Sequence, residues 1–142
     1  MIVPDLNVLL YAADDSSVRH HAAKEWLEIA VNDSGEEVAL PWVVHLGFLR
    51  LTTSPKVFSR PLTVDQALEW LDYFRSAPSV VPLNPGPGHA GILRHLLLVA
   101  GTGGNLTTDA HLAALALEND ATLVTGDRDY LRFAGLKIKF PF

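Results

Sequence analysis

Four aspartates of this chain lie at positions that could meet at one edge of a predicted sheet. In "TLVTGDRDY", residues 122–130, Asp127 and Asp129 follow an apolar segment after one glycine. Asp5 directly follows the first apolar segment of the chain, and Asp109 opens the stretch "DAHLAALALEND" that leads to residue 122. Binding sites in parallel α/β sheets form outside the carboxyl ends of the strands. We therefore expect these four acids to converge at one edge of a sheet.

Carboxylates that converge repel one another, which raises the pKa of at least one of them. A Mg²⁺ or Mn²⁺ ion removes that conflict, because hard cations take oxygen ligands. Such an ion can activate water and stabilise charge on a phosphoryl oxygen, which is the chemistry of phosphodiester hydrolysis. The pattern predicts a metal site held by Asp5, Asp109 and Asp127, with Asp129 close by.

Each of these acids also has an ordinary structural interpretation. Asp5 could cap a helix that starts at residue 6, and an acid such as Asp109 is favoured in the first turn of a helix. Asp127 suits a turn, and Asp129 could cap the short helix "YLRF". Three or four acids at one edge together favour the metal site over these separate roles.

The elements that must position the acids alternate between short apolar strands and helices. The expected strands are Ile2–Pro4, Val38–Leu40, Val80–Leu83, Thr122–Thr125 and Leu136–Phe140. Helical signals lie between them: a capping-box spacing of Thr63 and Gln66, a helix that starts at Pro41, and a buried helix capped by Thr107 or Thr108. This order predicts a three-layer α/β/α fold with a mostly parallel central sheet.

Composition sets the limits on function. A chain of 142 residues fits one domain, residues 1–142, and the net charge of −5 disfavours tight non-specific binding of nucleic acid. The absence of cysteine excludes thiolate metal sites and disulfides. No apolar run approaches the ~20 residues of a membrane span, and the N-terminus lacks the basic start of a signal peptide. We expect a cytoplasmic protein that makes no contact with a membrane.

Three stretches resemble PIN-domain ribonucleases, and most closely the VapC-type toxins of VapBC toxin–antitoxin systems. They are "VPDLNVLLYA", "LPWVVHLGFLRLTTSPKVF" and "TTDAHLAALALENDATLVTGDRDY", and the resemblance runs from Met1 to about Leu136. It implies a parallel sheet sandwiched by helices and cleavage of RNA with Mg²⁺ or Mn²⁺ held by an acidic cluster. It also implies a VapB-like antitoxin that covers the cleft, and a homodimer formed through the apolar face of "PWVVHLGFLRL".

The resemblance assigns roles to residues that match the motifs. Asp5, Asp109 and Asp127 become metal ligands, and Asp129 becomes a neighbouring group or a further metal contact. Asn7 would orient Asp5 or a water on the metal, and Thr125 would position the neighbouring carboxylate.

One departure from the family concerns an expected glutamate. Gly47 stands where the family usually has that acid, which puts binding of two metal ions in doubt. His45 lies two residues away and faces elsewhere on a helix. Glu36 and Glu37 precede a strand, at the wrong end of the sheet.

Basic residues have two interpretations each. Arg128, between the two aspartates, is either solvent-exposed or in contact with phosphate. Arg60 and Lys56, in the loop "SPKVFSRP", either keep the surface polar or meet an RNA backbone, with Arg60 the better phosphate ligand. None of the six histidines is paired at the i, i+4 spacing of a helical zinc site.

Two other functions compete with that of a metal-dependent endoribonuclease. A receiver-like signalling domain needs an acidic pair directly after its first strand, whereas Asp14 and Asp15 come too late, and the third strand ends in "LNPGPGH" rather than an aspartate. A PIN-like RNA- or protein-binding module with weak or no catalysis, suggested by the missing glutamate, remains open.

Overall fold

The computed structural model describes residues 1–142 and is built on a five-stranded sheet. The strands are β1 (Ile2–Pro4), β2 (Val38–Pro41), β3 (Val80–Leu83), β4 (Thr122–Val124) and β5 (Lys137–Lys139). Their order is β3-β2-β1-β4-β5, and every neighbouring pair is parallel. All five predicted strands are present, although β2 runs on to Pro41, β4 stops before Thr125, and β5 is shorter than predicted.

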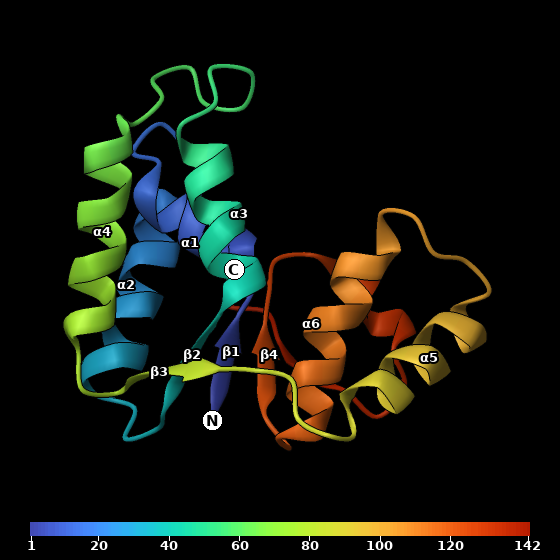
Figure 1. Ribbon diagram of the computed structural model, residues 1–142. Coiled ribbons are helices and arrows are strands. Elements are labelled where there is room, and N and C mark those ends of the chain that lie inside the picture. Colours follow the sequence, from blue (N-terminus) through green and yellow to red (C-terminus); the bar gives the residue numbers. More distant parts are fainter.

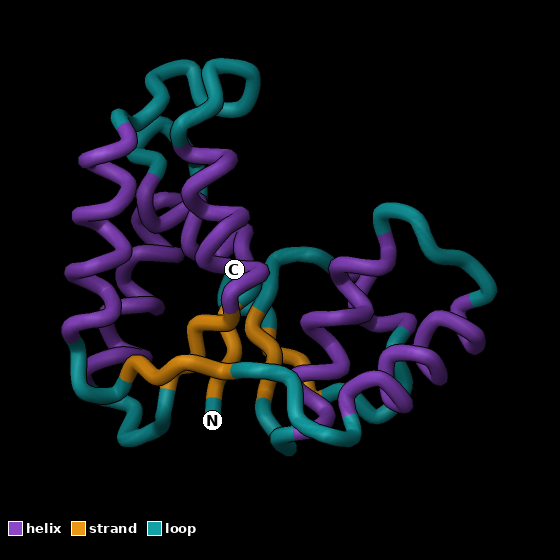
Figure 2. Tube along the Cα trace, in the orientation of Figure 1, coloured by secondary structure: helices purple, strands orange, loops and turns teal.

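Helices cover both faces of this sheet. They are α1 (Leu6–Ala13), α2 (His20–Asn32), α3 (Trp42–Thr52), α4 (Val64–Ser76), α5 (His89–Ala100) and α6 (Leu106–Glu118), followed by a short 3₁₀ helix, η1 (Arg128–Arg132). Helices α1 to α4 gather on one side, and α5 and α6 on the other (Figure 1). The strands lie between the two groups of helices (Figure 2). The predicted three-layer α/β/α fold is confirmed.

Helix starts follow the sequence signals in part. Thr63 and Gln66 form the predicted capping box at the start of α4. Helix α3 starts at Trp42, one residue after Pro41. The prediction for α6 was wrong: the helix starts at Leu106, before Thr107 and Thr108. Its first amide groups donate to loop carbonyls, from Leu106 N to Gly103 O, so no threonine cap is needed.

Two features of the fold position the acids. Strand β1 lies in the middle of the sheet, and Asp5 N donates to Val124 O at 2.8 Å, which joins the carboxyl ends of β1 and β4. Helix α6 carries Asp109 and packs between β4 and α5 on small, fully buried side chains such as Ala113 and Ala114. None of the helices is both long and apolar enough to cross a membrane.

Candidate metal centre

Asp5 is a buried carboxylate held by four hydrogen bonds. It caps α1, since its Oδ1 accepts from Leu6 N at 2.7 Å. Its Oδ2 accepts from the Thr125 hydroxyl at 2.7 Å and from Asn7 Nδ2 at 2.9 Å. Tyr130 contributes the fourth contact, at 3.4 Å from Oδ1. These bonds fix the orientation of a carboxylate that is only 8% exposed.

Asn7 and Thr125 join the ends of β1 and β4 around this carboxylate. Asn7 Nδ2 also donates to Thr125 Oγ1 at 3.2 Å, and Asn7 Oδ1 accepts from Gly126 N at 3.1 Å. Thr125 Oγ1 in turn accepts from Asp127 N at 3.0 Å. The first turn of α1 is therefore linked through two side chains to the loop that carries Asp127.

Tyr130 brings Asp5 and Asp109 together. Its hydroxyl lies 3.4 Å from Asp5 Oδ1 and 3.3 Å from Asp109 Oδ1, and its side chain is almost completely buried. One phenol carries one proton and cannot donate to both carboxylates at the same moment. Asp5 and Asp109, 104 positions apart along the chain, thus share a single hydrogen-bond donor, and this role of Tyr130 was not predicted from the sequence.

The pKa values show that the acids interact. Burial and, to a smaller extent, the charge of Asp109 raise the pKa of Asp5 to about 6, against the lowering effect of its hydrogen bonds. Burial also raises the pKa of Asp109, and the charges of Asp127 and Asp129 add to this. Burial and both carboxylates raise the pKa of Tyr130, so the phenol stays protonated. A bound cation would relieve this accumulation of negative charge.

The cap of η1 is Asp127 rather than Asp129. Asp127, not Asp129, caps the short helix η1, because Asp127 Oδ1 accepts from Asp129 N at 2.8 Å. The expectation that Asp129 is the cap was wrong. The backbone of Asp127 is extended, which is the conformation that a cap requires.

The donor set suits a hard cation but is smaller than predicted. No three Asp, Glu or His side chains are arranged so that they could hold a metal ion. Asp5 and Asp109 offer carboxylate oxygens around one hydroxyl. Mg²⁺ is commonly held by one or two carboxylates and completes its shell with water and substrate phosphate. The pair therefore fits Mg²⁺ or Mn²⁺ in type and number, with Asp127 and Asp129 adding charge nearby.

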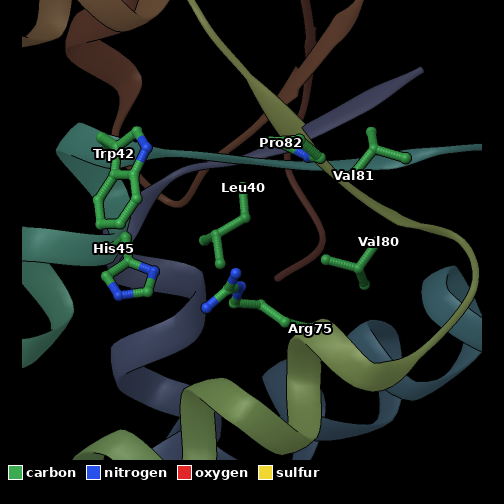
Figure 3. A pocket seen from close by; sticks show the side chains of 7 residues that line it. All are labelled: Leu40, Trp42, His45, Arg75, Val80, Val81 and Pro82. Carbon is green, nitrogen blue, oxygen red and sulfur yellow. The ribbon is translucent and has the colours of Figure 1, made fainter.

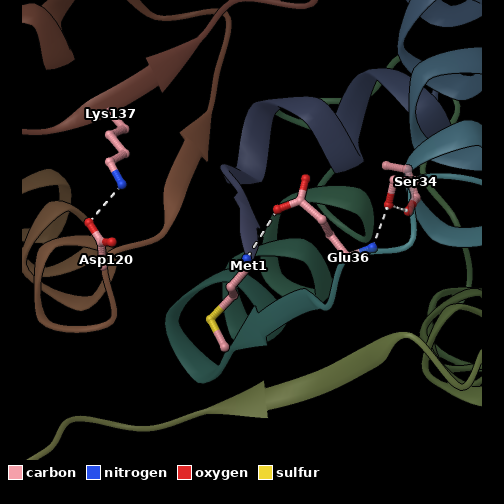
Figure 4. A network of polar contacts seen from close by, with 6 residues as sticks. Met1, Ser34, Glu36, Asp120 and Lys137 are labelled. Carbon is pink, nitrogen blue, oxygen red and sulfur yellow. Dashed lines mark hydrogen bonds and ion pairs between the residues drawn. The ribbon is translucent and has the colours of Figure 1, made fainter.

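The position of the missing glutamate is filled by an apolar side chain. A Cβ atom added at Gly47 would lie 2.5 Å from Leu6 Cδ2. The two glutamates near β2 do not replace it: Glu36 accepts from the amino group of Met1 at 3.2 Å, among the polar contacts at the amino ends of the strands (Figure 4). The centre has no carboxylate on the α3 side.

Other candidate residues lie outside the acidic cluster. His45 lines a hollow of about 150 Å³ with Trp42, Arg75 and residues of β2 and β3, and no aspartate lines it (Figure 3). Arg60 lines a different hollow, with Asp14 and Asp15. Arg128 turns its guanidinium over the ring of Phe140, at 4.5 Å.

The sequence matches the family model of the PIN domain over residues 2–136. The chain belongs to the PIN domain family. Ribonuclease VapC37 from Mycobacterium tuberculosis (strain ATCC 25618 / H37Rv) is 42% identical over 141 residues, which cover 99% of this chain and 97% of the relative. Ribonuclease VapC33 from the same strain is 39% identical over 141 residues, which cover 99% and 98%.

Solved structures share the fold of this PIN domain. The crystal structure of VapBC2 from Rickettsia felis, bound to a DNA fragment from its promoter, matches with a TM-score of 0.70 and 22% identity, and the match covers 98% of each chain. FitAcB from Neisseria gonorrhoeae matches with a TM-score of 0.68 and 20% identity, over 99% of this chain and 98% of the other.

Proposed function

We propose that this PIN domain is a metal-dependent endoribonuclease that hydrolyses RNA phosphodiester bonds and acts as the toxin of a type II toxin–antitoxin pair. Relatives named as VapC ribonucleases, similar over nearly the full chain, support the reaction class. The observation that carries the proposal is the meeting of Asp5 and Asp109 at the hydroxyl of Tyr130, at the carboxyl edge of the sheet.

The side chains around the Tyr130 hydroxyl have two roles, metal binding and the orientation of Asp5. Asp5 and Asp109 would hold Mg²⁺ or Mn²⁺, with Asp127 and Asp129 beside them. A divalent ion there supplies activation of water and neutralises charge on the phosphodiester. Thr125 and Asn7 keep Asp5 in one orientation through their hydrogen bonds. Mutation of such orienting residues commonly lowers metal affinity or activity by about 10- to 100-fold.

The test is an RNA cleavage assay on purified protein with Mn²⁺ or with EDTA. Asp5→Asn and Asp109→Asn should each lower the cleavage rate by more than about 100-fold, since even outer partners of a metal site change activity by up to that factor. Asp15→Asn is the matched control, because Asp15 is exposed and its side chain makes no hydrogen bond. Cleavage in EDTA, or equal rates for all four proteins, would remove these acids from the reaction.

A second candidate is an RNA- or protein-binding module with weak or no catalysis. It is favoured by the apolar filling at Gly47 and by the absence of a three-acid set in the structure. RNA that is bound but left intact in saturating Mn²⁺ would support this function over the nuclease.

The partner that we propose is a VapB-like antitoxin. Similar folds occur in solved VapBC complexes. Such an antitoxin would cover the acidic centre and restrain the enzyme in the cytoplasm, where the cellular RNA lies. Co-expression with the product of a small neighbouring gene should yield a complex that purifies as one species and does not cleave RNA. If that complex cleaves RNA as fast as the free chain, inhibition by this partner is ruled out.

A further inference from the structure

Arg19 is an exposed arginine held by two aromatic rings. Its guanidinium carbon lies 5.4 Å from the centre of the Tyr11 ring and 5.3 Å from that of Phe142. The two rings meet edge to face, with centres 5.5 Å apart. The guanidinium makes no ion pair and no hydrogen bond, so its five N–H donors are free while its position is restrained.

The same guanidinium lies against the loop of the acidic centre. A Cβ atom added at Gly126 would be 3.0 Å from Arg19 Nη1 and 2.8 Å from Phe142 Cε2. Gly126 stands between Thr125 and Asp127, and its N–H is bonded to Asn7. Glycine at this position leaves room for the arginine and the aromatic ring next to the loop.

A second arginine, Arg128, lies on this loop and also stacks on an aromatic ring. The guanidinium carbon of Arg128 lies 4.5 Å from the centre of the Phe140 ring and makes no ion pair, although Arg128 stands between Asp127 and Asp129 in the sequence. Phe140 follows β5, whose Lys139 O accepts from Thr125 N at 3.1 Å. Two phenylalanines near the end of the chain therefore each support one arginine beside the candidate metal centre.

We propose that Arg19 and Arg128 form a phosphate-binding subsite for single-stranded RNA at the rim of the acidic centre, and that Tyr11, Phe140 and Phe142 hold the two guanidinium groups in place. This inference rests on the proposed function, because RNA is the substrate it names. The chain has a net charge of −5, and Asp5 and Asp109 meet at the site while the charges of Asp127 and Asp129 act on Asp109. A polyanion needs local cations to approach it, and arginine forks match phosphate oxygens in pairs.

The first experiment measures binding of a short, fluorescein-labelled, single-stranded RNA of mixed sequence by anisotropy, in EDTA so that the RNA stays intact. Arg19→Gln and Arg128→Gln should each weaken binding about tenfold, as expected for a lost hydrogen bond to a charged group. Each should also reduce the slope of log K against log salt by about 0.7, the value for one phosphate contact on a single strand. The double variant should reduce it by about 1.4.

Arg94→Gln is the matched control. Arg94 is an exposed arginine on the outer helix α5, and its replacement changes the net charge by the same amount. Its RNA affinity and salt slope should equal those of the wild-type protein. Thermal unfolding by circular dichroism verifies that every variant is folded.

The aromatic support has its own test. Phe142→Ala should weaken RNA binding and lower the salt slope as Arg19→Gln does, whereas Phe142→Tyr keeps a ring and should bind like wild type. In a protein that already carries Arg19→Gln, Phe142→Ala should have little further effect, because the two residues then act as one unit. Additive losses would show that Phe142 does not act through Arg19.

The outcomes separate this inference from the proposed function. If the wild type cleaves RNA with Mn²⁺ while Arg19→Gln and Arg128→Gln bind like Arg94→Gln, the subsite is wrong and the nuclease stands. If the predicted losses appear without any cleavage, the subsite stands and the nuclease is wrong. If folded wild-type protein binds no RNA, or if the arginines matter only for an acidic protein partner, the subsite for RNA is overturned.

Discussion

At the scale of single residues, the burial of Asp5 has a consequence for pH. Its pKa is about 6 in the folded protein, against 3.8 for an unperturbed aspartate. The neutral form is thus favoured by ~3 kcal/mol relative to the unfolded chain. The contribution of Asp5 to stability is fully present below pH 3.8 and is lost as the pH rises through about 6. Above that pH the metal-free protein contains an ionised, buried carboxylate.

This pH dependence predicts how metal ions act. A proton and a divalent cation compete for the same carboxylate. Mn²⁺ should therefore raise the thermal unfolding midpoint more at about pH 8 than at about pH 5, where Asp5 is mostly protonated. Calorimetry with and without Mn²⁺ measures the difference, and Asp5→Asn should abolish it. An equal gain at both pH values would exclude Asp5 as a ligand.

The residues that sequence reasoning missed are those whose partners are distant in the chain. Tyr130 follows an acid and gives no local signal, since its contacts with Asp5 and Asp109 arise only when η1 packs against β1 and α6. Arg19 was missed for the same reason, because Phe142 supports it from the other end of the sequence. Asp5 and Asp109 could be located because they adjoin strongly patterned elements.

At the scale of elements, local signals predicted structure best where the stabilising contacts are also local. The apolar runs predicted both ends of every strand to within one residue. The capping box at Thr63 was also correct. The start of α6 was misplaced because Leu106 is buried by tertiary packing, and loop carbonyls accept its first hydrogen bonds. The amides of Leu106 and Thr107 donate to the carbonyls of Gly103 and Gly104, so neither needs a threonine cap.

The capping box of α4 can be tested directly. Thr63 Oγ1 accepts from Gln66 N at 3.1 Å, and Gln66 Oε1 accepts from Thr63 N at 3.0 Å. Thr63→Ala should lower the free energy of unfolding by ~1 kcal/mol, because the Gln66 amide loses its acceptor, the Thr63 hydroxyl. Urea denaturation measures the change. Thr63→Ser keeps the hydroxyl and should remain close to wild type, and a loss as large as that of alanine would exclude the hydrogen bond as the cause.

At the scale of the whole molecule, the face of α3 is the surface through which we expect a homodimer. Trp42 and Leu46 lie one helical turn apart and are 56% and 57% exposed. Leu46→Glu should shift a dimer towards monomer in sedimentation velocity, because it places a charge in an apolar contact. Leu98→Glu, at a residue 66% exposed on α5, is the control. If both variants sediment like the wild type, the face of α3 is excluded as the dimer interface.

The central position of β1 in the sheet affects the order in which the protein folds during synthesis. Strands β1, β2 and β3 can associate early during synthesis, whereas β4 follows β1 by more than one hundred residues and pairs with it on the side opposite β2. Asp5 and Arg19 emerge from the ribosome early, but Asp109, Tyr130 and Arg128 follow only near the end of translation. A nascent or truncated chain would therefore carry an incomplete nuclease, and a cell that makes this protein would be exposed to its activity only after translation is almost finished.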